Sequence, residues 1–266
     1  MLQNKTAVIY GAGGSLGGAV AKAFAASGVK VFLTGRNIGS VQKVADEIAA
    51  DGGTAYADEV DSLDEKAVND HLAKVVQQAG TVDISFNAAA CNVVQNLPMT
   101  EIAVDDFMLP VTFMTKTRFI TAIAAGKIMM KQGSGVILSL TATPGGIGYP
   151  FTAGFAPACA AIESFSRNLA AELGIYGVRV VNIRSAGSPD SQVFKDAIVA
   201  NSKAMEPILR NMENDTMLKK LPLMEDITNV AVFLSSHLAG KITGVTVDVT
   251  CGTTAGLNYR ASAGGF

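Results

Sequence analysis

Short apolar runs alternate with amphipathic stretches along the whole chain of 266 residues. The apolar runs are bounded by glycine or polar residues and predict buried strands at 5–10, 29–34, 54–57, 82–86, 135–140, 178–183 and 245–249. Apolar residues at helical spacing predict helices at 19–26, 40–50, 64–79, 107–131, 157–173 and 226–235. Segment 190–221 is also expected to be mostly helical, although it is polar and has no clean apolar stripe.

This alternation of strands and helices predicts an α/β fold. Strands that are apolar throughout are typical of a parallel sheet, which has helices on both faces and right-handed crossovers. Pro110 is expected in the first turn of the 107–131 helix, where proline is tolerated. No linker, repeat or low-complexity stretch interrupts the pattern, so residues 1–266 are expected to form a single domain. Ligands of such domains bind beyond the carboxyl ends of the strands, where the strand order reverses.

Composition and charge exclude several classes of function. The net charge of −2 gives no electrostatic reason to expect binding to nucleic acid or to an anionic membrane. The three cysteines are scattered and form no metal or disulfide pattern, which indicates a reducing compartment. The chain opens without a secretory leader pattern, and no apolar run reaches membrane-spanning length. We therefore expect a soluble, cytoplasmic protein that binds no metal.

A glycine-rich turn follows the first predicted strand and is the strongest local signal for a ligand. Its sequence is Gly11-Ala12-Gly13-Gly14-Ser15-Leu16-Gly17, and a helix of small residues comes next. Glycines let the backbone approach a diphosphate closely, and the N–H groups at the helix start then face the phosphate oxygens. Many tight turns carry glycine for steric reasons alone, but the strand before and the helix after favour a dinucleotide site. Without a Gly-Lys-Ser/Thr sequence, the turn is not an ATP- or GTP-binding P-loop.

Polar residues follow the next predicted strands. Arg36 comes directly after the second strand, where an arginine suits a 2′-phosphate and so favours NADP(H); the alternative is a solvated arginine in a turn. Asp58 and Glu59 end the third strand, and one of them can accept a hydrogen bond from an adenine amino group or simply face solvent. Asn87 and the alanines after it end the fourth strand, where small residues let a cofactor lie on the backbone.

Four segments of the chain together resemble the motifs of the short-chain dehydrogenase/reductase family. They are 11–17, which has Ser15 where the family's middle glycine is usual, and 87–90, 178–187 and 242–252. The last match is the most specific, and the resemblance covers essentially the whole chain. It implies a three-layer, Rossmann-like, doubly wound parallel sheet of about seven strands. It also implies a nicotinamide cofactor, a small-molecule alcohol or carbonyl substrate, and a homotetramer or dimer paired through helices 107–131 and 155–173.

The resemblance and the strand-end residues together give one set of expected cofactor contacts. These residues are Gly11, Gly13, Gly14, Ser15, Leu16, Gly17, Arg36, Asn37, Glu59, Val60, Asn87, Ala88, Ala89, Ala186 and Gly187. With Arg36 among them, the expected cofactor is NADP(H) rather than NAD(H).

The family's catalytic residues are replaced in this chain. The family uses a tyrosine as proton donor, a lysine four residues later that lowers the tyrosine pKa, a serine and an asparagine. The tyrosine and lysine positions correspond to Phe155 and Cys159, and the asparagine position to Thr112. The serine position corresponds to Thr141 or Ala142, and only Thr141 has a hydroxyl that could polarise a carbonyl.

Three interpretations of this replacement stay open at this point. The protein can be a reductase or dehydrogenase with an atypical proton donor, for which Thr141 and Tyr149 are the candidates; Tyr149 can equally be a loop aromatic that only packs on its neighbours. It can instead bind NADP(H) as a signal or scaffold without turnover, or be the inactive subunit of a mixed oligomer. Cys159 lacks a basic partner in the sequence, which favours a buried packing role over a nucleophile.

Overall fold

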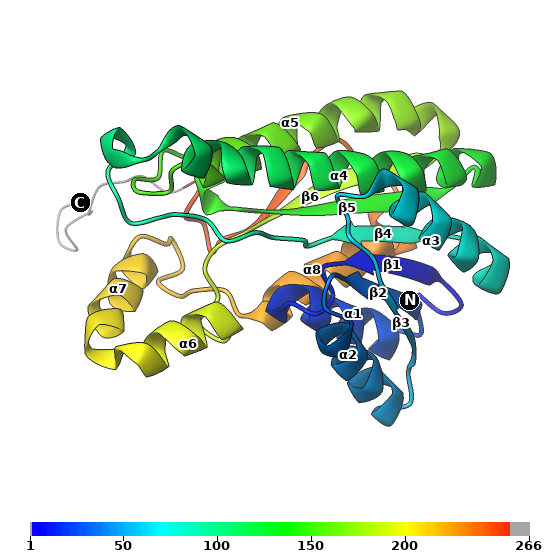
Figure 1. The fold of residues 1–266 in the computed structure, drawn as a ribbon, viewed down its shortest axis with the longest axis horizontal. Coiled ribbons are helices and arrows are strands. Elements are labelled where there is room, and N and C mark those ends of the chain that lie inside the picture. The colour runs from blue at the N-terminus through cyan, green and yellow to red at the C-terminus, as the bar shows by residue number, and fades with distance from the viewer. Residues whose placement is uncertain (1, 256–266) are drawn as a thin grey trace, which may run out of the picture.

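Seven parallel strands form one sheet at the centre of the protein (Figure 1), in the order β3-β2-β1-β4-β5-β6-β7. The structure is a computed structural model that describes residues 2–255. The strands are β1 (Thr6–Tyr10), β2 (Lys30–Gly35), β3 (Thr54–Glu59), β4 (Ile84–Asn87), β5 (Gly135–Ala142), β6 (Val178–Ser185) and β7 (Thr246–Val249). Every neighbouring pair is parallel, which confirms the predicted sheet.

Helices cover both faces of this sheet (Figure 1). One face carries α1 (Ser15–Ala26), α2 (Ile38–Ala50) and α8 (Met224–Ser235), and the other carries α3 (Glu65–Ala79), α4 (Val104–Gln132) and α5 (Phe155–Leu173). Side chains alternate along each strand between the two faces of the sheet. Ala7 and Ile9 therefore pack into the hydrophobic core under α1, α2 and α8, and Val8 and Tyr10 pack into the core under α3, α4 and α5. The predicted three-layer, doubly wound architecture is thereby confirmed.

The sheet order reverses between β1 and β4, and this point places the candidate site. Tyr10 at the end of β1 is in register with Thr34 of β2 on one side and with Asn87 of β4 on the other. Because all strands run in the same direction, the segments that follow them meet at one edge, called here the carboxyl edge. The glycine turn after β1 lies in the middle of that edge, as the sequence predicted.

The structure corrects the predicted start of the 107–131 helix and divides the helical segment 190–221 in two. Helix α4 begins at Val104, so Pro110 lies inside the helix and not in its first turn. Asp105 and Asp106 fall in that first turn, where carboxylates stabilise the positive helix end. The segment 190–221 contains two helices, α6 (Gln192–Ala200) and α7 (Ser202–Asn214). They separate at Asn201, whose side chain caps α7 by accepting a hydrogen bond from Ala204 N.

Short 3-10 turns lie between the longer elements of the fold. The turns lie at Met99–Glu101, Thr143–Gly145, Gly174–Tyr176 and His237–Ala239. Within residues 2–255, every helix is too short or too polar to cross a membrane.

Candidate functional site

The glycine turn packs so closely on its neighbours that side chains would not fit. Gly11 has a φ of +77°, and a Cβ on it would lie 2.7 Å from the backbone N of Ala89. A Cβ on Gly17 would lie 2.3 Å from the carbonyl oxygen of Gly11. The N–H groups of Gly11 and Ala12 both donate to the carbonyl of Thr34. The turn is therefore a rigid backbone cradle at the point where the strand order reverses.

The helix that starts from this cradle has no acidic or capping side chain at its positive end. Gly14 caps α1 without a side chain, and the first turn of α1 contains no acidic residue. By contrast, Asn37 and Asp64 cap α2 and α3 with their own side chains. The first N–H groups of α1, on Ser15 and Leu16, have no acceptor within their own helix. This cradle fits a diphosphate, because backbone N–H groups and the helix dipole attract phosphate oxygens.

Ser15 ties the cradle to two later segments. Its Oγ accepts a hydrogen bond of 3.1 Å from the N–H of Gln192, the first residue of α6. The same hydroxyl donates to the sulfur of Met224 over 3.2 Å. Asp190 accepts from the N–H of Met224 and so holds the start of α8 beside the chain that leads into α6. The glycine turn and the start of α6 are therefore in direct contact, although 177 residues separate them.

The residues predicted for the adenosine half lie at the ends of β2 and β3, but they do different things. Arg36 is exposed and reaches across to α4, with its guanidinium carbon 5.7 Å from the ring centre of Phe113. Asn37 caps α2 through Ser40, and the N–H of Val60 donates to the carbonyl of Gly35. Glu59 is exposed beside Gly35 at the end of the ladder.

Asp58 is already paired within the protein. Its carboxylate contacts Lys74, and the Nε2 atom of His71 lies 3.4 Å from it. Burial lowers the pKa of His71 from its usual value, so the imidazole is neutral at physiological pH. Of the two acids that the sequence offered for adenine, only Glu59 is therefore without an ion-pair partner within residues 2–255.

Asn87 organises the end of β4. Its buried amide donates to Thr121 Oγ1 over 2.9 Å and to the carbonyl of Thr117, and its side-chain oxygen accepts from Ala89 N. Ala88 donates its N–H to the carbonyl of Tyr10. These bonds join the end of β4 to α4 and fix the Ala88–Ala89 backbone against Gly11.

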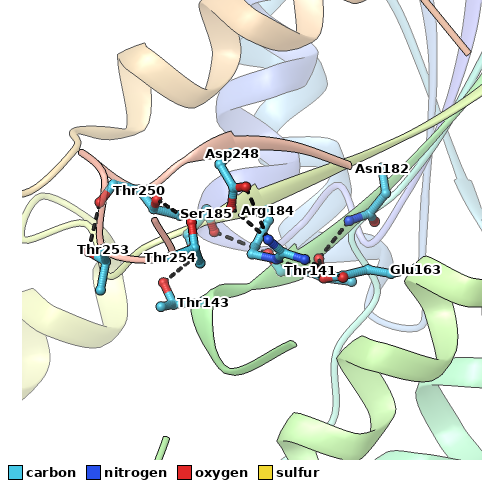
Figure 2. A network of polar contacts seen from close by, with 10 residues as sticks. All are labelled: Thr141, Thr143, Glu163, Asn182, Arg184, Ser185, Asp248, Thr250, Thr253 and Thr254. Carbon is cyan, nitrogen blue, oxygen red and sulfur yellow. Dashed lines mark hydrogen bonds and ion pairs between the residues drawn. The ribbon is translucent and has the colours of Figure 1, made fainter. Parts of the chain in front are cut away.

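Thr141 lies inside a polar network, with its hydroxyl fully engaged (Figure 2). It is 3% exposed; its Oγ1 donates to Glu163 over 2.9 Å and accepts from the amide of Asn182 over 2.7 Å. Arg184 continues the network by binding Glu163 on one side and both carboxylate oxygens of Asp248 on the other. The network joins β5, β6, β7 and α5, so Thr141 is part of a buried structural junction.

The positions compared with the family's tyrosine and lysine lie in an apolar cluster. Cys159 is fully buried with Phe113 and Met114 of α4, and Phe155 packs at the rim. Burial raises the pKa of the Cys159 thiol to about 11, so it is protonated at neutral pH. Thr112 points the other way, on the exposed face of α4. From α4, Phe113 and Met114 face this cluster, and the buried Arg118 lies close to Cys159.

Tyr149 and the Ala186–Gly187 pair complete the predicted residues. Tyr149 is 39% exposed in the loop after β5, and burial is the larger cause that raises the pKa of its phenol, which is thus protonated at neutral pH. Ala186 donates its N–H to the carbonyl of Val249. Gly187 leaves no room for a side chain, because a Cβ there would lie 2.6 Å from the ring of Phe194 in α6.

Sequence reasoning missed the buried charges of this region. Arg118 of α4 is 3% exposed and Glu163 of α5 is 4% exposed. Both stand on the buried face of an amphipathic helix, and a charged residue on such a face is the signal that could have identified them. Within residues 2–255, no three histidine, cysteine, aspartate or glutamate side chains gather as metal ligands would.

Comparisons with known proteins identify a family and related chains. The family model described as enoyl-(acyl carrier protein) reductase matches residues 11–254. The 7alpha-hydroxysteroid dehydrogenase of Escherichia coli is 29% identical over 259 residues, which cover 97% of each chain. The 2,3-dihydro-2,3-dihydroxybenzoate dehydrogenase of Bacillus subtilis is 27% identical over 260 residues, 96% of this chain and 98% of that one.

Solved structures share the fold. An NAD+-bound xylitol dehydrogenase superposes with a TM-score of 0.87 at 23% identity, covering 94% of this chain and 99% of that one. Levodione reductase superposes with a TM-score of 0.88 at 23% identity, covering 97% and 100% of the two chains. At these identities the likeness concerns the architecture.

Proposed function

The chain belongs to the short-chain dehydrogenase/reductase family, whose members bind NAD(P)(H), and from this premise we propose that it is an NADP(H)-dependent oxidoreductase. Its substrate would be a small alcohol or carbonyl compound. Its catalytic site would be atypical, because Phe155 and Cys159 stand where the family has its tyrosine and lysine. The whole chain would act as one dinucleotide-binding domain.

One observation carries the cofactor proposal: the backbone cradle of Gly11–Gly17 leads into a helix end without an acid or a capping side chain. The N–H groups at the start of α1 would hold the diphosphate. Ala88 and Ala89 would bear the cofactor along the end of β4, and Ala186 and Gly187 along the end of β6. Gly13, Gly14 and Leu16 would complete the turn around the phosphates.

Arg36 supports NADP(H) over NAD(H). Its guanidinium is exposed and has no carboxylate partner within residues 2–255, so it is available for a 2′-phosphate. An acid at this place would instead favour the free ribose hydroxyls of NAD(H). Asn37, Glu59 and Val60 would line the adenosine beside it.

The bound cofactor would supply the hydride, and the chain would supply orientation and a proton. Thr141 and Tyr149 stay the proposed groups for that proton. The phenol of Tyr149 is protonated at neutral pH and partly exposed, so it can donate directly or through water. The hydroxyl of Thr141 would have to leave Glu163 before it could polarise a carbonyl.

A second candidate function rests on the apolar cluster of Phe113, Met114, Phe155 and Cys159. A site without an ionisable proton donor suits a protein that binds NADP(H) as a signal or scaffold, alone or as the inactive subunit of a mixed oligomer. Calorimetric titration with NADPH tests the binding that both candidates share. NADPH oxidation with a panel of aldehydes and ketones then separates them, since turnover supports the enzyme and its absence in a cofactor-binding protein supports the second candidate.

We also propose that two or four copies assemble through α4 and α5. Phe119 is 55% exposed on α4, and its ring centre lies 5.9 Å from that of Phe165 on α5. Both rings line a hollow of about 240 Å³ between the two helices. An exposed aromatic ring packed on a half-buried one beside a hollow is typical of an interface between protein chains.

A further inference from the structure

Arg118 is a cation buried in the protein without an acid beside it. One of its terminal nitrogens, Nη1, donates to the carbonyl of Ala89 and to the hydroxyl of Thr117, and the other, Nη2, lies 3.5 Å from the carbonyl of Leu140. Its Nε atom is buried and has no hydrogen-bond partner within residues 2–255. No carboxylate of these residues lies within 4 Å of the guanidinium, whereas the half-buried Arg184 binds two. Proteins normally pair a buried charge, because taking it from water is costly.

The location of this charge is defined by the two carbonyls it binds. Ala89 is the second residue after β4 and touches Gly11 of the cradle, and Leu140 lies in β5. A diphosphate on the cradle divides a dinucleotide into two halves. Since Arg36 and Glu59 place the adenosine at the ends of β2 and β3, the nicotinamide half must cross the ends of β4, β5 and β6. The guanidinium of Arg118, bound to the carbonyls of Ala89 and Leu140, lies beneath the place proposed for the nicotinamide half.

The guanidinium keeps its charge at neutral pH. Burial lowers its pKa to about 10, which is still well above physiological pH. The titratable groups around it are the thiols of Cys159 and Cys91, and burial raises the pKa of both, so they are neutral. Arg36, which acts on the same Cys91 thiol, adds a second positive charge on this side. The field of Arg118 is therefore not cancelled locally.

We propose that the buried guanidinium of Arg118 makes the nicotinamide half of this site selective for the reduced cofactor. The inference rests on the NADP(H) site proposed above. The oxidised nicotinamide ring carries a positive charge and the reduced ring is neutral, so a fixed cation in a region of low dielectric constant repels only the oxidised form. Because of this repulsion, the protein binds NADPH more tightly than NADP+. Such a preference suits a protein that works in the direction of reduction or that reports the reduced cofactor.

The test measures the ratio of the dissociation constants of NADP+ and NADPH by calorimetry. We expect the wild-type ratio to exceed one, and Arg118→Met to lower it about tenfold, the size expected for two like charges inside a protein. Arg118→Lys keeps the charge and should keep the ratio. Arg179→Met is the matched control, because Arg179 also binds backbone carbonyls, those of Leu234 and Ile242, but lies at the opposite edge of the sheet. It should lower thermal stability without changing the ratio.

Each failure has a different meaning. A wild-type protein that binds both forms equally, or an unchanged ratio in Arg118→Met, overturns the role of Arg118 and leaves the cofactor proposal standing. A wild-type protein that binds neither nucleotide overturns both. If Arg118→Met does not fold, Arg118→Gln removes the charge but keeps a donor for the carbonyls of Ala89 and Leu140, and the same change in ratio is expected.

Discussion

The Oγ1 atom of Thr141 lies 2.9 Å from Oε1 of Glu163, and this hydrogen bond determines what Thr141 can do. The hydroxyl donates its proton to the carboxylate and accepts from Asn182, so it has no second proton to offer a ligand. Glu163 in turn neutralises Arg184. The hydroxyl therefore completes a buried junction between β5, β6 and α5, and it can reach a ligand only by leaving Glu163.

We predict that Thr141→Val destabilises the protein by about 1–3 kcal/mol, because it leaves Asn182 and Glu163 each short of a hydrogen bond in the interior. Thr141→Ser keeps the hydroxyl and should restore most of that stability. Urea unfolding of the three proteins measures the difference. A Thr141→Val protein of unchanged stability that has lost turnover would instead assign Thr141 to catalysis.

Gly11 offers a test of the cradle with a matched control. Gly11 and Gly52 have nearly the same positive φ, +77° and +80°, but a Cβ on Gly52 would meet nothing within 4 Å. Gly52→Ala should cost only about 1–2 kcal/mol for the left-handed backbone. Gly11→Ala adds a clash with Ala89 and should also abolish NADPH binding in calorimetry. Equal stability and equal affinity of the two variants would refute the close approach.

Arg36→Ala should raise the dissociation constant of NADPH by roughly tenfold to a hundredfold, the range of a charge-assisted hydrogen bond, and leave that of NADH nearly unchanged. Arg210→Ala is the control, since Arg210 is exposed and pairs with Glu206 on α7. Calorimetric titrations of NADPH and NADH against the wild type and the two variants measure these dissociation constants. Tighter binding of NADH than NADPH by the wild type would argue against NADP(H) as the cofactor.

Restoring the family's pair should work only when Arg118 is changed as well. Cys159 is fully buried beside Arg118, so a lysine there would face an unneutralised like charge. We expect Phe155→Tyr with Cys159→Lys to lose about 3 kcal/mol or more of stability. Adding Arg118→Met should recover part of it and permit carbonyl reduction.

Urea unfolding of the single, double and triple variants gives the coupling between positions 118 and 159. The same stability loss with and without Arg118 would show that the guanidinium does not act on position 159. A stable, cofactor-binding triple variant without activity would show that the nicotinamide site differs in more than these side chains.

Phe119→Glu should lower the molecular mass of the oligomer measured by analytical ultracentrifugation, because burying a charge between two copies of the chain is costly. Ile175→Glu is the control: Ile175 is 83% exposed but lies away from the α4–α5 hollow. A wild-type protein that is already monomeric, or a Phe119→Glu protein of unchanged mass, would contradict assembly through this face.

Local patterns explain why so much of the fold could be predicted. Each apolar run became a strand, and the glycine turn lies at the reversal of strand order, because strand burial and tight turns leave short-range signatures. The start of α4 could not be located as well. Pro110 marked a helix beginning, whereas the helix starts at Val104, where Asp105 and Asp106 stabilise its first turn.

The chemistry of the site was harder to predict than its position. Arg118, Glu163 and Arg184 find their partners on other strands and helices, and periodicity carries no information about such distant pairs. The sequence identified Phe155 and Cys159 as departures from the family. It could not indicate that a cation from α4 occupies the space beside them.

The hydrogen bond between Ser15 and Gln192 couples the glycine turn to α6. Neither α6 nor α7 has a buried residue, so few contacts restrain this helix pair, and the hydroxyl of Ser15 is one of them. A phosphate oxygen that accepts from this hydroxyl takes the place of the Met224 sulfur and reorients the oxygen that accepts from the first N–H of α6. Thermodynamic linkage then requires that nucleotide occupancy and the order of α6 alter each other's free energy by equal amounts. Hydrogen exchange in α6 would thus report what is bound at a turn far away in the sequence.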